Sequence, residues 1–346
     1  MVVRHADPDD RLDDRLRAWV WEDFGVELVA VTGVDRGADV AAEVWRGVAD
    51  GGAQYAIKRS GGGSPAGLLV PAWLGERGVP GVVAPVPTRS GNLWSEREGR
   101  RLSLVPWVSG SGALDGGMTA CHWVSYGTLL ARVHALTPGD PVAEVLPREE
   151  RAHRRWTSLV SDVDKQVRAA AESADQLVRA LTEEWAAVAE LVAVLLGAAE
   201  DLSSDHRVRR AARVVCHGDA HLGNVVVGEG GRVWLIDWDD AVLAPREQDL
   251  LFVLGGVLPF AQVSSQEQAW FFDGYGPVDV DPARLAYHQC VRALEDFAVP
   301  AAQVLAVGRE PEPERADALA IFRSVFSPTG LATLALSSLR DLGLTR

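Results

Sequence analysis

Cysteine and long apolar runs are scarce in this chain. Its three cysteines, Cys121, Cys216 and Cys290, are scattered without the spacing of a metal site, so we expect reduced thiols rather than a disulfide framework. The longest apolar run, residues 191–199, is flanked by glutamates and is too short to span a bilayer. The first ten residues lack the apolar segment of a secretion signal. We therefore expect a cytoplasmic protein without a membrane partner.

Positive charge is also in the minority. The 346 residues contain 34 Lys and Arg against 48 Asp and Glu, which gives a formal net charge of -14. Such a balance disfavours nonspecific binding to nucleic acid and to anionic membranes, and it attracts cations. An apolar content of 47% with 24% charged residues is typical of a folded globular protein, and the length suggests two lobes.

The residues that carry recognisable chemistry lie between positions 214 and 240. This stretch reads VVCHGDAHLGNVVVGEGGRVWLIDWDD. Alternation and turn residues predict a short strand, a polar loop, and then two strands that form a hairpin across a glycine-rich turn. The second hairpin strand leads into Asp237. We expect the hairpin to lie beneath the loop.

Three side chains of this stretch match the needs of phosphoryl transfer. That reaction requires a carboxylate that orients the attacking hydroxyl and accepts its proton, and oxygen ligands for the metal that bridges the phosphates. Asp219 and Asn224 are five positions apart, the spacing of the catalytic Asp and the metal-binding Asn in a kinase loop. Asp237 stands where that scheme places its main metal carboxylate, and Mg2+ prefers such ligands. An isolated His-Gly-Asp is usually a plain turn, but the joint pattern favours a phosphotransferase.

A two-metal phosphoesterase is the alternative interpretation of the same loop. The Gly-Asp-x-His of residues 218–221 also occurs in those enzymes, whose metals need several further His and Asp ligands. Such a site would require an upstream Asp-x-His and a downstream Gly-Asn-His. The chain has neither, because Leu93 follows Asn92 and Val225 follows Asn224.

The loop HGDAHLGN and the strand IDWD resemble the signature of the aminoglycoside phosphotransferases, small-molecule kinases with a protein-kinase-like fold. The flanking segments IDWDDAVLAPREQDLLFVLGG, FFDGYGPVDVD and ALEDFAV resemble the spectinomycin phosphotransferase branch. The resemblance implies an α+β, bilobal fold. Residues 1–105 would form a nucleotide-binding lobe on an antiparallel sheet, and residues 106–346 a mainly helical lobe with the catalytic loop and the acceptor site.

The resemblance also implies roles for individual residues. Asp219 would be the catalytic base, and Asn224 and Asp237 would hold Mg2+ beside ATP. His217 would support the loop through backbone hydrogen bonds, and Asp249 would brace it, although a carboxylate there could also cap the helix that follows.

Lysine is nearly absent, since Lys58 and Lys165 are the only two. A lysine on the apolar strand that ends in Tyr55-Ala56-Ile57-Lys58 indicates a need for a compact point charge at phosphate oxygens. The alternative is a surface lysine on an edge strand, with its charge in water. The resemblance implies that Lys58 holds the ATP phosphates.

Two further segments are expected to contact the nucleotide. The turn of residues 35–39 has a single glycine and reads equally well as a plain turn, but the resemblance implies a nucleotide loop that includes Arg36 and Gly37. The resemblance also places the adenine against backbone groups near Val105 and Val108. Pro106, between them, has no N–H to donate.

The sequence departs from the kinase pattern at one point. A kinase uses a Glu on the next helix to fix its phosphate lysine, but residues 60–75 contain no acid. Glu76 lies at the end of the expected helix, which Pro71 should interrupt. Either Glu76 pairs with Lys58 from an unusual position, or Asp237 and the nucleotide orient Lys58 alone.

Periodicity and turn residues predict the remaining elements. We expect strands and helices in an order that begins with one amphipathic helix, continues with a strand meander and a Gly/Ser-rich link at residues 109–117, and ends in a helical region. The expected strands are residues 27–32, 40–47, 53–59, 82–88, 92–95 and 101–107; the expected helices are residues 11–24, 121–136, 149–167, 175–202, 250–254, 266–275, 282–299, 312–325 and 330–342.

The acceptor is expected to be a cationic antibiotic, with spectinomycin the leading candidate, phosphorylated as a resistance mechanism. The resemblance brings forward Glu295 and Asp296, with Asp240 as a weaker candidate for binding ammonium groups. Adjacent acids on a helix point about 100° apart, so one of the pair should be solvated. Alternatives are a kinase for another natural product, such as a nucleoside antibiotic, or for an amino sugar, and a nucleotide-binding protein without turnover. We expect a monomer or weak dimer.

Overall fold

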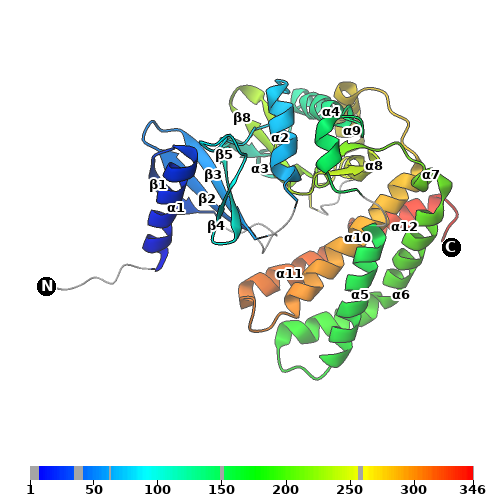
Figure 1. Ribbon diagram of the computed structural model, residues 1–346. Coiled ribbons are helices and arrows are strands. Elements are labelled where there is room, and N and C mark those ends of the chain that lie inside the picture. Colours follow the sequence, from blue (N-terminus) through cyan, green and yellow to red (C-terminus); the bar gives the residue numbers. More distant parts are fainter. Residues whose placement is uncertain (1–7, 35–41, 62–63, 149–151, 256–259, 346) are drawn as a thin grey trace.

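The computed structural model describes residues 8–34, 42–61, 64–148, 152–255 and 260–345. Its N-terminal part is an antiparallel sheet of five strands in the order β1-β2-β3-β5-β4 (Figure 1). The strands are β1 Leu28–Gly33, β2 Ala42–Ala49, β3 Gln54–Ser60, β4 Ser95–Arg97 and β5 Arg100–Pro106.

A small core joins this sheet to helix α1, Pro8–Phe24. Leu16 and Val20 of the helix meet inward-facing residues of the strands, among them Ile57 on β3 and Leu104 on β5, which have no exposed surface. The alternation along β3 therefore buries Ile57 towards α1 and directs its neighbour Lys58 to the opposite face of the sheet.

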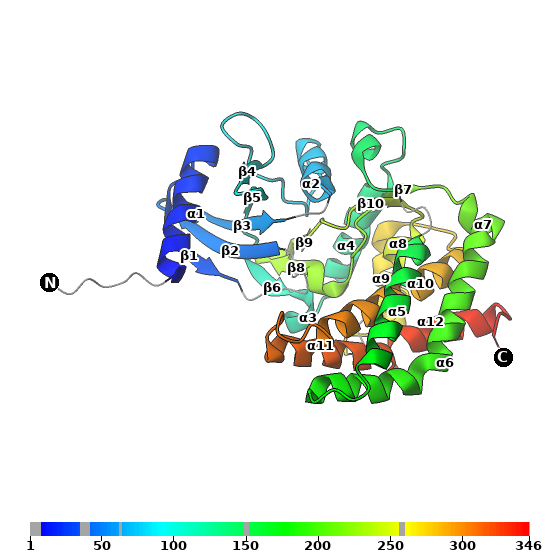
Figure 2. The same ribbon diagram turned by 60° about the horizontal axis from the view of Figure 1, so that its bottom comes forward.

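The rest of the chain is mainly helical and has its own, larger core (Figure 2). Helix α10 packs against α5, α6, α11 and α12, while α4 packs against α9. The helices are α2 Ala66–Glu76, α3 Ala113–Gly116, α4 Ala120–His134, α5 Ala152–Ala169, α6 Gln176–Ser204, α7 His206–Arg209, α8 Glu247–Leu250, α9 Ser265–Tyr275, α10 Pro282–Val304, α11 Glu312–Val325 and α12 Leu331–Asp341. None of the helices that the structure describes combines the length and hydropathy of a membrane-spanning segment.

Two small sheets carry the stretch of residues 214–240. Strand β8, Val225–Gly228, pairs with β9, Val233–Leu235, as the predicted hairpin, and β6, Gly110–Gly112, adds a third strand to it. Strand β7, Val214–Cys216, pairs with β10, Val242–Ala244. The polar loop of residues 217–224 therefore runs between two sheets, and its ends are fixed by backbone ladders.

Five predicted elements are wrong. The strand predicted at residues 92–95 is displaced, because β4 covers Ser95–Arg97 and residues 92–94 form no strand. Residues 82–88 form no strand, because they run between the two parts of the molecule with isolated hydrogen bonds such as Val86 N–H to the Leu104 carbonyl oxygen. Residues 109–117 are not a plain link, since they hold β6 and α3. Helix α2 continues across Pro71, which removes one intrahelical bond without ending the helix. The helix predicted at residues 250–254 is absent, because α8 ends at Leu250 and residues 251–254 form turns.

Candidate active site

A cavity of about 320 Å³ lies between the five-stranded sheet, α2 and the β8–β9 hairpin. Its walls combine apolar side chains from the sheet with a polar end formed by Lys58, Asp237 and Asp239. Val105 and Val108, which the resemblance places beside adenine, are among the residues that line this cavity. The Trp107 N–H is already bound to the Gln54 carbonyl oxygen, and Pro106 has no N–H, so Val108 is the next backbone donor along this segment.

Lys58 forms a triad with two carboxylates, which we call the lysine triad. Its Nζ lies 3.2 Å from Asp237 Oδ1 and 2.5 Å from Asp239 Oδ2. Although burial alone would lower the pKa of Lys58, the charges of Asp237 and Asp239 outweigh it and raise that pKa above its usual value. The lysine is therefore fully charged and directed at the acids that end β9.

Asp237 has a left-handed backbone, with φ of 60°. This region costs a non-glycine residue energy, and such strained residues gather at functional sites. The turn directs the chain away from β9 immediately after Leu235 and Ile236. Because the Ile236 N–H donates to the Asn224 carbonyl oxygen, Asn224 and Asp237 come from adjacent points of the hairpin. Their carboxylate and amide oxygens are ligands that suit Mg2+.

The polar loop is held by a buried carboxylate. Asp249 accepts hydrogen bonds from the backbone N–H groups of His217, at 2.7 Å, and Gly218, at 2.8 Å. His217 in turn bonds through Nε2 to the Ile236 carbonyl oxygen at 3.0 Å, and its Nδ1 accepts the Asp219 N–H. Gly218 has φ of +88°, and a Cβ there would meet the Asp240 carbonyl oxygen at 2.1 Å.

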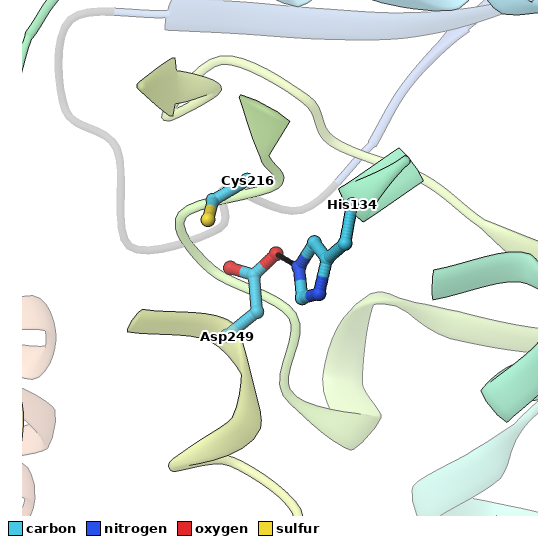
Figure 3. Close-up of side chains that lie close together, drawn as sticks. All are labelled: His134, Cys216 and Asp249. Atoms are coloured by element: carbon cyan, nitrogen blue, oxygen red, sulfur yellow. Dashed lines mark hydrogen bonds and ion pairs between the residues drawn. The ribbon is translucent and has the colours of Figure 1, made fainter. Parts of the chain in front are cut away.

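Asp249 also joins a buried group with His134 and Cys216 (Figure 3). The picture shows the Asp249 carboxylate between the His134 ring and the Cys216 thiol, and His134 Nε2 lies 3.0 Å from Asp249 Oδ2. His134 Nδ1 contacts the Tyr275 hydroxyl, and both carboxylate oxygens already accept backbone N–H groups of the loop. These ligand types could bind a metal, but their existing partners make the group a brace beneath the loop.

Every oxygen of the Asp219 side chain has a partner. Asn224 Nδ2 donates to Oδ2 at 3.1 Å and to the Asp219 carbonyl oxygen at 2.8 Å, and His221 Nε2 lies 3.3 Å from Oδ2. Arg292 Nη1 donates to Oδ1 at 2.8 Å. Burial alone would raise the pKa of Asp219, but the charge of Arg292 and the His221 contact hold that pKa well below its usual range.

Arg292 bridges Asp219 to a second acid, Asp296, whose Oδ1 lies 2.7 Å from Arg292 Nε. The guanidinium also lies over the Phe252 ring, 5.2 Å from its centre. We call the residues around this bridge, namely Asp219, Asp240, Arg292, Glu295 and Asp296, the arginine cluster.

The acids of the arginine cluster are more buried than the sequence predicts. Burial, opposed by Arg292 and reinforced by Asp296, raises the pKa of Glu295 to about 7. Burial and Asp219 likewise raise the pKa of Asp240. The expectation that one of Glu295 and Asp296 is solvated is wrong, because Arg292, one turn before Asp296 on α10, draws that acid inward while Glu295 packs beside it.

The structure rules out one of the remaining predicted contacts and does not describe two of the remaining predicted residues. Arg36 and Gly37 lie outside the described residues. Glu76 is largely exposed and its only ion pair in the described part of the chain is with its neighbour Arg77, at 3.8 Å. Of the two alternatives for Lys58, pairing with Glu76 is therefore wrong.

Sequence reasoning missed three residues that touch the predicted site. Asp239 and His221 lie inside the quoted motifs and could have been proposed from their polarity and position. Arg292 lies 73 residues beyond its partner Asp219, and a single arginine on an amphipathic helix gives no signal of such a contact.

A profile of the phosphotransferase enzyme family matches residues 70–288. The chain belongs to this family. The match spans more than half of the chain and includes the polar loop, the hairpin and most of α2. A search of curated protein sequences found no significant match. The predicted enzyme class, a phosphotransferase, is confirmed.

Solved phosphotransferase structures share the fold. Spectinomycin phosphotransferase in complex with ADP and spectinomycin has a TM-score of 0.82 at 24% identity, over 94% of this chain and 98% of that one. Amicoumacin kinase in complex with AMP-PNP and Ca2+ has a TM-score of 0.61 at 16% identity, over 94% and 95%. A macrolide 2'-phosphotransferase from Brachybacterium faecium has 0.55 at 16%, over 89% and 98%. At these identities the likeness establishes the fold, and the predicted bilobal α+β kinase-like architecture is confirmed.

Proposed function

We propose that the protein is an ATP-dependent O-phosphotransferase that modifies a hydroxyl group of an antibiotic and so confers resistance by inactivation. The observation that carries the proposal is a chain of contacts that links four side chains, of which Lys58 and Asp237 line the cavity. Asp219 and Asn224 are hydrogen bonded to each other, Asn224 is adjacent to Asp237 across the hairpin, and Asp237 is paired with Lys58.

Each of these side chains has a defined task. Asp219 orients the acceptor hydroxyl and receives its proton, which suits a loose transition state where a weak base suffices. Asn224 donates through Nδ2 to Asp219. The Oδ1 of Asn224 and the Asp237 carboxylate would then hold Mg2+. The metal would neutralise charge on the phosphates. Lys58 supplies a fixed positive charge at the same phosphates.

The two parts of the molecule divide the work in this proposal. Residues 1–105 would form the nucleotide-binding lobe, with the adenine against Val105 and Val108. Residues 106–346 would form the lobe that carries the catalytic loop and the acceptor site. The cavity between the sheet and the hairpin supports this division, and relatives of the same fold were solved with ADP or AMP-PNP.

The charges of the arginine cluster favour a cationic acceptor. Spectinomycin is the leading candidate, because a spectinomycin phosphotransferase has the highest TM-score among the structures reported above. In the arginine cluster four acids surround one arginine, so an excess of negative charge remains after Asp219 and Asp296 share Arg292. In the part of the chain that the structure describes, Asp240 and Glu295 make no direct ion pair with Arg292, although its charge acts on both. An amino sugar would meet the same charges, whereas a neutral nucleoside antibiotic would not use them.

An ATP-consumption screen over spectinomycin, aminoglycosides, macrolides, nucleoside antibiotics and amino sugars tests the proposal. We expect one cationic antibiotic to stimulate ATP use and to gain one phosphoryl group by mass spectrometry. Stimulation by an amino sugar alone would support a metabolic kinase. Tight ATP binding without any turnover would identify a nucleotide-binding protein instead.

A further inference from the structure

Helix α2 occupies the place next to Lys58 but offers it no carboxylate. Its sequence, AGLLVPAWLGE, has a single acid at the last position, and that acid points into solvent beside Arg77. A phosphate-binding lysine needs a fixed anionic partner, because a four-carbon side chain otherwise samples many rotamers. The partner must therefore come from another element.

The nearest acid to Lys58 is Asp239, two residues beyond Asp237. Asp239 Oδ2 lies 2.5 Å from Lys58 Nζ, closer than Asp237 Oδ1 at 3.2 Å. Both acids can hold the lysine while no phosphate is bound. Asp237 is the residue proposed to hold Mg2+, and a carboxylate engaged with a metal has less charge to offer a lysine. Asp239 carries no such second task.

Helix α2 is shaped to admit Asp239. Gly67, in its first turn, lies so close that a Cβ on Gly67 would meet Asp239 Oδ1 at 2.4 Å, its Cα at 2.9 Å and its N at 3.0 Å. A side chain at this position would push the Asp239 backbone away. The glycine thus lets the chain after β9 approach the first turn of α2 while Asp239 stays within contact of Lys58.

We propose that Asp239 is the positioning residue for Lys58, taking over the task of the missing helix carboxylate, and that Gly67 is the feature of α2 that makes room for it. This inference rests on the proposed function, since Lys58 must bind phosphates for its position to matter. It assigns separate tasks to two acids of one Ile-Asp-Trp-Asp segment: Asp237 to the metal and Asp239 to the lysine.

The first test compares Asp239→Asn with Glu76→Gln in the full chain. A charge-assisted hydrogen bond contributes enough that its loss should raise KM for ATP about tenfold to a hundredfold in Asp239→Asn. The magnesium concentration needed for half-maximal rate should change much less. Glu76→Gln, the matched acid-to-amide control, should leave both quantities unchanged. A raised KM in Glu76→Gln with a normal KM in Asp239→Asn would overturn the proposal.

Two further variants separate positioning from general damage to the fold. Gly67→Ala should displace Asp239 and raise KM for ATP, while Gly197→Ala, a helix glycine with nothing within 4 Å of its Cβ position, should not.

Pro71→Glu places a carboxylate on the cavity-lining face of α2. In the Asp239→Asn background it should recover most of the lost ATP affinity. Failure of the rescue, with both double and single variants folded by circular dichroism, would contradict the idea that the site needs only an acid beside Lys58.

Calorimetric binding of ATP with Mg2+ to the wild-type protein makes the two proposals distinguishable. If the wild type does not bind ATP, the proposed function fails. If the wild type binds ATP and Asp239→Asn binds equally well, the function stands and the role of Asp239 is refuted.

Discussion

The lysine triad and the arginine cluster each set one long cation between carboxylates, but they differ in burial. Asp237 and Asp239 are 52% and 43% exposed, so water reaches the lysine triad from one side. In the arginine cluster Asp219, Arg292 and Asp296 are only 17% to 20% exposed. Buried charges need partners far more than exposed ones do. The lysine triad can therefore release Asp237 to a metal and its cation to phosphates, whereas Arg292 is a permanent part of the fold.

Replacement of Asp219 should have the largest effect on turnover. We expect Asp219→Ala to lower kcat by about 10²–10⁴-fold, the usual contribution of a general base, while ATP still binds because the nucleotide contacts lie elsewhere. Steady-state kinetics and calorimetry measure the two quantities. A variant with near-normal kcat would remove Asp219 from the mechanism and leave the arginine cluster without a catalytic member.

Stability measurements test directly whether burial distinguishes the arginine cluster from the lysine triad. Arg292→Met leaves Asp219 and Asp296 buried without their cation, so we expect the free energy of unfolding to fall by about 3–5 kcal/mol. Lys58→Met, the matched change in the lysine triad, should cost about 0–1 kcal/mol, because its acids are half-exposed. Urea denaturation of both variants gives the values. Equal losses would show that burial does not distinguish the two groups.

The sequence predicts the helices and strands of this protein better than it predicts the ion pairs between distant residues, for a physical reason. Hairpins and amphipathic helices depend on residues a few positions apart, so β8, β9, α10 and α11 lie close to their predicted positions. The strand predicted at residues 82–88 is absent, because a segment that lies between two parts of the molecule is apolar even when it forms no strand ladder. The pairing of Arg292 with Asp219 depends on how α10 docks against the loop, which no local pattern encodes.

The two acids of the lysine triad should respond differently to magnesium. Asp237→Asn should raise the Mg2+ concentration for half-maximal rate on the order of tenfold or more, because it removes a charged ligand. Asp239→Asn should change this requirement less. Titration of activity with Mg2+ at saturating ATP gives the order. The reverse order would mean that Asp239 is the metal ligand, and the division of tasks between them would be wrong.

The smallest expected effect concerns the pH dependence of acceptor binding in the arginine cluster. With a pKa of about 7, Glu295 is neutral below that pH and charged above it. Its attraction for an ammonium group should therefore appear as pH rises through about 7, so KM for a cationic acceptor should fall severalfold between pH 6 and 8, on the order of the energy of one partly screened ion pair. Glu295→Gln should flatten this dependence and reduce the effect of added salt.

Asp296→Asn should alter stability more than KM, because Asp296 is already paired with Arg292. The KM for ATP serves as the internal control, since the charges that act on Glu295 are those of the arginine cluster and the ATP phosphates are proposed to bind at the lysine triad. The acceptor's own amines must stay charged over this range, which an acceptor with amine pKa values well above 8 ensures. If the acceptor KM of Glu295→Gln matches the wild type at every pH, the charge excess of the arginine cluster does not bind substrate, and a neutral acceptor becomes the better hypothesis.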